Sequence, residues 1–187
     1  ALRHLIAIYQ HERDWHEAIE QARRLEAMTG ESQAHPIAHF YCELAEQSRQ
    51  HGARREAFAY LDKAFACKSD CVRAFMLTGQ MQAEEGHHAE AVDTFEKAIN
   101  CEVAYVPEIL PLLIASYNQS QQTDRAERFL RGVLTRYHGV SPVLALADIY
   151  ARRDGKRVAI EFLTSQLRQR PSVRGMMTLI DATMAHT

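Results

Sequence analysis

The segment AEAVDTFEKAI (residues 89–99) places a small, a large and a small apolar residue on one side of a helix. Ala91, Phe95 and Ala98 are separated by four and three positions, the spacing at which residues of an α-helix share a face. A small residue on such a face lets a second helix approach closely, because a larger side chain would force the two apart. The segment therefore predicts one helix of a closely packed helix pair.

The same pattern recurs along the whole chain, around alanines spaced 39, 34, 35 and 33 residues apart. A period near 34 residues is typical of the tetratricopeptide repeat, a pair of helices that stacks on its neighbours. The sequence predicts an all-α fold: a right-handed solenoid of tetratricopeptide helix pairs, with five repeats plus a C-terminal capping helix. The alanines are Ala18, Ala57, Ala91, Ala126 and Ala159, in the segments 15–27, 55–66, 89–99, 124–134 and 156–167.

These repeats are expected to form a single domain over residues 1–187, because each repeat of a solenoid packs only on its neighbours. The expected repeats are approximately 1–30, 36–69, 70–103, 106–138 and 141–171. A final helix at 172–185 is expected to cover the end of the fifth repeat with four apolar residues, because an end repeat otherwise leaves its stacking face in water. These are Met176, Met177, Leu179 and Ile180.

Local signals place several helix ends. Asp14 and Asp124 are each followed three residues later by glutamate, which favours N-caps at both positions. Gly52 and Gly86 fall at turns between paired helices, where a left-handed residue ends the first helix. Pro111 falls near the start of the fourth repeat's first helix, which we expect to begin late or to bend there.

No pattern in the sequence predicts catalysis, a cofactor or a metal. The four cysteines include no CxxC pair, and Cys67 and Cys71 flank a predicted turn between repeats. We interpret all four as small, mostly buried residues. The ten histidines do not supply the four ligands of a closed zinc site. Nucleophile-elbow, P-loop, dinucleotide-binding and zinc-protease motifs do not occur, so the chain is not expected to be an enzyme and should need no cofactor. Since it lacks an initiator Met and opens inside a helix, we expect a fragment.

A solenoid of helix pairs binds other proteins on the concave surface lined by its first helices. The repeat register assigns the outward face of these helices, although any helix also needs a polar face in water. Acidic and apolar residues such as Glu46 and Met76 argue against a clamp for a peptide carboxylate. The predicted protein-binding groove consists of His39, Glu43, Glu46, Arg73, Met76, Gln80, Glu108, Leu112, Asn118, Asp148 and Arg152.

Charge is unevenly distributed along the chain. Residues 1–124 hold 11 basic and 19 acidic residues, whereas residues 125–174 hold 11 basic and 4 acidic ones. Such a basic end indicates an acidic protein surface or an anionic lipid as partner, or else arginine-rich faces that are merely solvated. Nucleic acid is not expected, because the whole chain is slightly acidic and no aromatic residues alternate with the arginines. The predicted basic surface includes Arg125, Arg128, Arg153 and Arg157.

Three segments go beyond the general repeat pattern: PIAHFYCELA (36–45), LALADIYARRDG (144–155) and FLTSQLRQRPSVRGMMTLID (162–181). They resemble the repeat region of the lipopolysaccharide assembly protein B family of Gram-negative envelope regulators. Members of that family add an N-terminal membrane helix and a C-terminal rubredoxin-like metal knuckle, and neither element occurs among these residues. The resemblance implies a position on the cytoplasmic side of the bacterial inner membrane, with this fragment itself expected to be soluble.

The resemblance further implies an adaptor. The family helps a membrane-bound ATP-dependent protease to degrade the deacetylase of the committed step of lipid A synthesis. On this interpretation the repeats hold the deacetylase, the protease or both and perform no chemistry. The alternative is a generic peptide-binding repeat scaffold of a co-chaperone-like or secretion-related kind. A homodimer is left open.

Overall fold

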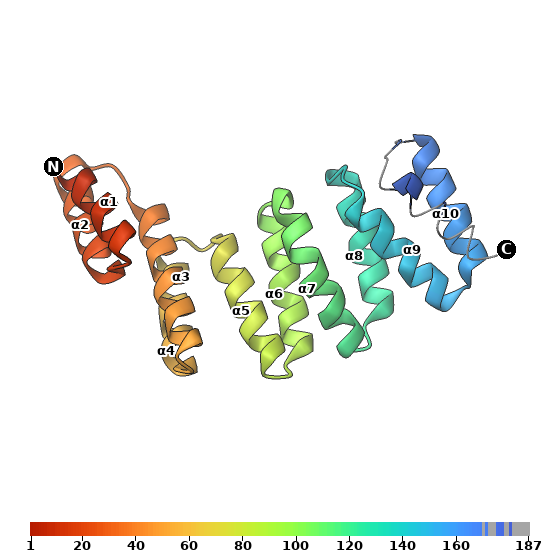
Figure 1. Ribbon diagram of the computed structural model, residues 1–187, viewed down its shortest axis with the longest axis horizontal. Coiled ribbons are helices and arrows are strands. Elements are labelled where there is room, and N and C mark those ends of the chain that lie inside the picture. The colour runs from red at the N-terminus through yellow and green to blue at the C-terminus, as the bar shows by residue number, and fades with distance from the viewer. Residues whose placement is uncertain (170, 172–174, 178–179, 181–187) are drawn as a thin grey trace. The chain divides into compact units, whose positions relative to one another are not determined.

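The structure is a computed structural model that describes residues 1–169, 171, 175–177 and 180 (Figure 1). Over these residues it contains ten α-helices and one 3-10 helix, and no strand. The predicted all-α fold is therefore confirmed. The chain divides into two compact units, an N-terminal unit (Ala1–Cys101) and a C-terminal unit (Glu102–Thr187). The boundary falls between the third and fourth predicted repeats.

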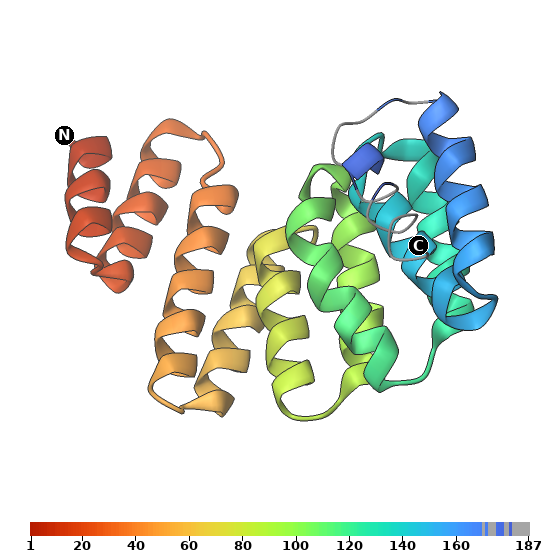
Figure 2. The ribbon, with the colours of Figure 1, turned by 45° about the vertical axis from the view of Figure 1, so that its right-hand side comes forward.

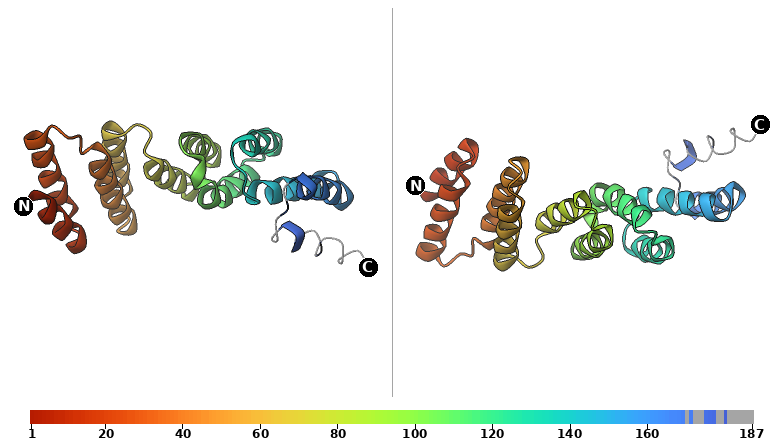
Figure 3. Two further views of the ribbon diagram at one scale, coloured as in Figure 1. Left: turned by 90° about the horizontal axis from the view of Figure 1, so that it is seen from above. Right: turned by 90° about the horizontal axis from the view of Figure 1, so that it is seen from below.

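The N-terminal unit contains three helix pairs, and within each pair the two helices pack against each other (Figures 2 and 3). Turns of two or three residues join the members of a pair, so they run antiparallel. Neighbouring pairs pack through α2 on α3, α3 on α5 and α4 on α5. The helices are α1 (Leu2–Glu12), α2 (Trp15–Thr29), α3 (Ala34–Gln50), α4 (Arg54–Cys67), α5 (Val72–Glu84) and α6 (His88–Cys101).

The C-terminal unit begins with the 3-10 helix η1 (Val103–Tyr105) and continues with two helix pairs. α7 packs on both α8 and α9, α8 packs on α9, and α9 packs on α10. The first helices of the fourth and fifth repeats, α7 and α9, thus lie side by side. The bounds are α7 (Val106–Gln119), α8 (Thr123–Arg136), α9 (Ser141–Arg153) and α10 (Lys156–Gln169).

The five recurring alanines are buried where the sequence pattern places them, on the second helix of each pair. Ala18, Ala57 and Ala91 are 0% exposed, Ala126 is 2% exposed and Ala159 is 6% exposed. A helix can cross close to its partner only where such a small side chain stands. The predicted repeat register is therefore confirmed.

The turn signals are confirmed in part. Gly52 and Gly86 have φ angles of 75° and 82°, in the left-handed region that a residue with a Cβ rarely adopts. The carboxylate of Asp14 accepts a hydrogen bond of 3.3 Å from the backbone N–H of Glu17, so Asp14 is the predicted N-cap. The same prediction is wrong for Asp124. An N-cap at Asp124 would start α8 at Arg125, but α8 begins two residues earlier, at Thr123, and its first turn closes on the carbonyl of Gln122.

Pro111 does not delay the fourth repeat. α7 begins at Val106, carries Pro107 in its first turn and continues through Pro111, so the predicted late start is wrong. A proline within a helix removes one backbone hydrogen bond. Here the helix is held instead by a buried apolar stripe, which outweighs that one bond. The stripe consists of Val106, Ile109, Leu110 and Leu113.

The predicted final helix lies mostly outside the described residues, and Leu179 is among those outside. Residues 175–177 are helical. The side chains of Met176, Met177 and Ile180 are 44%, 60% and 54% exposed, so covering of the fifth repeat by these three is not seen. The helix as a whole stays a prediction.

Two glycines inside helices give a matched test of close packing. A Cβ built on Gly79 of α5 would lie 2.6 Å from Cε1 of Phe95 on α6, whereas a Cβ on Gly132 of α8 meets nothing within 4 Å. We expect Gly79→Ala to lower the free energy of unfolding by about 1–2 kcal/mol, since overpacking outweighs the gain in helix propensity. Gly132→Ala should raise it by about 0.5–1 kcal/mol. Urea unfolding of both variants measures these changes, and a stabilising Gly79→Ala would contradict the close α5–α6 crossing.

Candidate functional site

In the N-terminal unit, the predicted groove residues lie on the facing first helices α3 and α5. An ion pair joins them: Nη2 of Arg73 lies 2.5 Å from Oε1 of Glu43. His39 stands one turn earlier on α3, with its Nε2 3.9 Å from the same carboxylate. Burial lowers the pKa of His39, so its imidazole is neutral near pH 7 and adds no charge to the pair.

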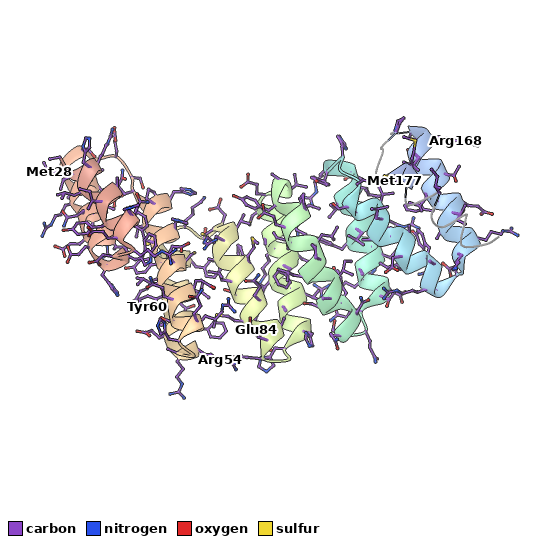
Figure 4. The ribbon with its side chains drawn as sticks, viewed as in Figure 1. Met28, Arg54, Tyr60, Glu84, Arg168 and Met177 are labelled. Carbon is purple, nitrogen blue, oxygen red and sulfur yellow. The ribbon has the colours of Figure 1, made fainter. Side chains whose placement is uncertain are left out.

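A second ion-pair group lies further along the same helices. Arg49 bonds to Glu46 through Nη2 (2.7 Å) and to Glu84 through Nη1 (2.7 Å), which again links α3 to α5. Glu84 lies near the end of α5 (Figure 4). The hydrogen bonds from Arg49 lower the pKa of Glu46. The sequence analysis did not include Arg49, because its partner Glu84 is 35 residues away.

The charges of this α3–α5 face therefore largely satisfy one another. The remaining predicted residues, Met76 and Gln80, are half-buried on α5. Exposed ion pairs contribute little binding energy and must be broken before a ligand can use either partner. The α3–α5 face thus offers a partner a polar surface whose charges are paired with one another, together with the half-buried thioether of Met76.

The C-terminal unit contains a cavity of about 340 Å³ where α7, the start of α8 and α9 meet. Three predicted groove residues, Asn118, Asp148 and Arg152, line it, whereas Glu108 is exposed and Leu112 is half-buried outside it. We call this site the α7–α9 cavity. Its lining consists of Ile114, Tyr117, Asn118, Thr123, Asp124, Ala126, Asp148, Ile149, Arg152 and Arg153.

The α7–α9 cavity has an apolar floor and a charged rim. Tyr117 and Ile149 are 1% and 7% exposed and form the floor. At the rim, Nη2 of Arg152 lies 2.7 Å from Oδ2 of Asp148, one helical turn before it on α9. Apolar pockets ringed by a few polar groups are the usual form of a ligand site. An apolar side chain of a bound peptide fits the floor, while its backbone and polar groups meet the rim.

Two of the four residues of the predicted basic surface form ion pairs with carboxylates. Arg153 bonds to Glu127 (2.6 Å) and to Asp154 (2.9 Å), and Arg157 bonds to Glu161 (3.1 Å). The Asp154 and Glu127 carboxylates raise the pKa of Arg153. These ion pairs make the electrostatic potential of this surface less positive than the number of basic residues in the sequence suggests.

Arg128 donates a hydrogen bond to the carbonyl of Asp124 (3.3 Å), which leaves its guanidinium charge in place. Arg125 donates a hydrogen bond to the side chain of Gln122 (3.1 Å). Attraction of this surface to an anionic partner stays a prediction.

A second pocket, not found by the sequence analysis, lies on α2, α3 and α4 and also measures about 340 Å³. The rings of Tyr41 and Tyr60 stack with centroids 6.4 Å apart, and Nζ of Lys63 lies 5.1 Å from the Tyr60 centroid. Arg23 donates a hydrogen bond of 2.9 Å to the hydroxyl of Tyr41. Tyr60 projects from α4 (Figure 4). These residues come from three helices, and no local motif connects them.

The part of the chain that the structure describes contains no group of three or more His, Cys, Asp or Glu residues that could hold a metal ion. No described helix is both long and apolar enough to cross a membrane.

Comparison with curated proteins finds close relatives over nearly the whole chain. The chain is 33% identical over 181 residues to lipopolysaccharide assembly protein B of Escherichia coli, covering 97% of this chain and 46% of that protein. The protein of the same name from Haemophilus influenzae is 31% identical over 172 residues, with 92% and 43% covered. The chain thus spans about half the length of the curated relatives that it matches. No family model matches.

Solved structures agree on the fold. A tetratricopeptide-repeat protein of Thermus thermophilus aligns with a TM-score of 0.51 at 15% identity, covering 98% of this chain and all of that one. Pseudomonas aeruginosa pilF aligns with a TM-score of 0.55 at 17% identity, covering 100% and 83%. YrrB, described as a repeat protein with an unusual peptide-binding site, aligns with a TM-score of 0.52 at 19% identity over 82% and 77%.

The solved structures share the repeat fold, and the curated relatives share the sequence over nearly the whole chain. The helix pairs, the buried alanines and the alignments all agree with the repeat fold. The chain is therefore a tetratricopeptide-repeat protein and a relative of lipopolysaccharide assembly protein B.

Proposed function

We propose that this chain is an adaptor that restrains lipopolysaccharide synthesis by bringing the lipid A deacetylase to a membrane-bound ATP-dependent protease. The name of the relatives supports a role in lipopolysaccharide assembly. The repeat fold supports a protein-binding scaffold, because such arrays present extended surfaces to partners. The adaptor acts on the cytoplasmic side of the inner membrane, where both of these partners are expected.

The observation that carries the proposal is the α7–α9 cavity. Two successive first helices enclose an apolar floor, with Asn118, Asp148 and Arg152 at its edge. These groups suit an extended or helical segment of a partner that inserts one apolar side chain. No group in the cavity is arranged as a nucleophile with its base, which favours binding over catalysis.

The adaptor works through effective concentration. Holding a substrate beside a protease converts a bimolecular encounter into one within a complex. The repeats need only bind, and we propose that they do so without a metal or a cofactor of their own.

Titration of the purified chain with the purified deacetylase, and separately with the purified protease, tests this function. We expect saturable binding to at least one of them, with a dissociation constant on the order of micromolar, typical of a transient interface. Because the proposal assigns no metal to these residues, adding EDTA should leave the affinity unchanged. Binding to neither protein would contradict the adaptor role and favour the generic peptide-binding scaffold. Loss of binding in EDTA would contradict the proposal that these repeats bind their partner without a metal.

A further inference from the structure

Two of the four cysteines meet inside the N-terminal unit. Cys42 lies in the middle of α3 and Cys71 lies immediately before α5, 29 residues later, and their sulfur atoms are 3.9 Å apart. Both are buried, at 0% and 7% exposure. The other two cysteines, Cys67 and Cys101, are half-buried and exposed. The interpretation of all four as small, mostly buried residues is confirmed for this pair and wrong for the exposed Cys101. It did not predict the contact between Cys42 and Cys71, because they belong to different repeats.

The two thiols differ in their surroundings. Cys71 is the N-cap residue of α5, and the nearby backbone N–H groups of Ala74 and Arg73 contribute to lowering the pKa of its thiol. The hydrogen bond from the thiol of Cys42 lowers the pKa of Cys71 most, and the pKa of Cys42 rises for the same reason. The pKa of Cys71 therefore lies below that of Cys42, so Cys71 is the first of the two to lose its proton. A thiolate is the reactive form of cysteine.

We propose that Cys42 and Cys71 form a reversible disulfide when the chain meets a hydroperoxide, and that this pair is a redox modification site. Neither the fold nor the proposed adaptor role depends on this reaction. The oxidant is hydrogen peroxide or a small organic hydroperoxide, since only a small oxidant can reach Cys71, a residue that is 7% exposed.

The reaction takes place in two steps. The Cys71 thiolate attacks one peroxide oxygen, so that an S–O bond forms and the O–O bond breaks. With hydrogen peroxide the leaving hydroxide becomes water on protonation, and Cys71 is then a sulfenic acid. The sulfur of Cys42 next attacks the sulfur of Cys71, the S–S bond forms and the S–O bond breaks. The departing hydroxide takes the Cys42 proton and leaves as a second water. Two thiols have lost two electrons and the peroxide has gained them.

The geometry requires only a small movement. The sulfurs must approach from 3.9 Å to the disulfide length of about 2 Å. The new bond would join α3 to the start of α5, where the Glu43–Arg73 ion pair already links the same helices. Oxidation would thus join the second repeat covalently to the third. The part of the predicted groove that lies on α3 and α5 would then be held in one arrangement. It would also restrict the unfolded chain, so the oxidised protein should melt at a higher temperature.

The remaining cysteines provide matched controls. Burial raises the pKa of both Cys67 and Cys101, so each reacts slowly with peroxide. The double variant Cys67→Ser/Cys101→Ser keeps only the proposed pair. The double variant Cys42→Ser/Cys71→Ser keeps only the two controls.

The test exposes the full chain and both variants to equimolar hydrogen peroxide and counts free thiols after denaturation. We expect the full chain to fall from four free thiols to two, and Cys67→Ser/Cys101→Ser to lose both of its thiols. Cys42→Ser/Cys71→Ser should retain both of its own. Peptide mass spectrometry should find the Cys42 and Cys71 peptides joined within one chain, and dithiothreitol should separate them. If the Cys67→Ser/Cys101→Ser chain keeps both thiols, or the linked peptides contain Cys67 or Cys101, the proposal is wrong.

A single variant separates the two steps and does not depend on the double substitution folding. In Cys42→Ser the second step cannot occur, so Cys71 should accumulate as a sulfenic acid that dimedone traps. Circular dichroism verifies that this variant is helical. Dimedone labelling at Cys67 or Cys101 but not at Cys71 would overturn the assignment of the attacking sulfur.

Discussion

Phe95→Ala is expected to lower the free energy of unfolding by about 3–5 kcal/mol, which is a large fraction of the stability of an ordinary domain. The Phe95 side chain is 0% exposed and lies on α6 against the glycine of α5, at the close crossing of the third repeat. Removing the ring leaves a cavity beside Gly79, where no side chain can fill the space. Because repeats are stabilised by their neighbours, the loss should extend to the second repeat. Urea unfolding followed by circular dichroism measures the change.

Phe58→Ala is the control for this prediction. Phe58 lies on α4 of the same unit and is only partly buried against the core. The same atoms are removed, but less apolar area returns to water, so the cost should be less than half of that for Phe95→Ala. Equal costs for the two variants would mean that the α5–α6 crossing is not the closely packed element described above.

The sequence predicts the helix pairs well because their signals are local. Ala91 and Phe95 stand four residues apart, and the spacing alone shows that they share a face. Gly86 and Asp14 act within their own turns, so their roles can also be inferred from a few neighbours. Asp124 shows the limit of this reasoning. Because α8 begins at Thr123, Asp124 lies inside the helix and is not its N-cap.

The candidate site is less predictable because it depends on pairs that are distant in the sequence. The face of α7 that lines the cavity contains Ile114 rather than Leu112, a rotation that the repeat register does not resolve. The sequence assigns Arg153 to a basic surface. In the structure its guanidinium bonds to the carboxylate of Glu127, 26 residues away, which neutralises its charge. The contact between Cys42 and Cys71 likewise arises only when α3 and α5 pack together.

The central claim is that partner binding uses the α7–α9 cavity, and Arg152→Glu is the sharpest change to it. Arg152 lies at the rim of the cavity together with Arg153, and it forms an ion pair with Asp148. The substitution makes the rim acidic while leaving the apolar floor in place. Arginine is enriched among the residues that dominate binding energy, so we expect the affinity for the bound partner to fall at least about tenfold. Since the Arg152–Asp148 pair is exposed, the fold should be little affected.

Arg157→Glu is the matched control, because Arg157 also pairs with a carboxylate four residues away and lies on α10 outside the cavity. The decisive measurement is the dissociation constant of each variant for whichever partner, deacetylase or protease, the unmodified chain binds. The account predicts a loss of about tenfold or more for Arg152→Glu and less than about twofold for Arg157→Glu. An equal loss in both would assign binding to the basic surface, and unchanged affinity in both would contradict the cavity as the binding site.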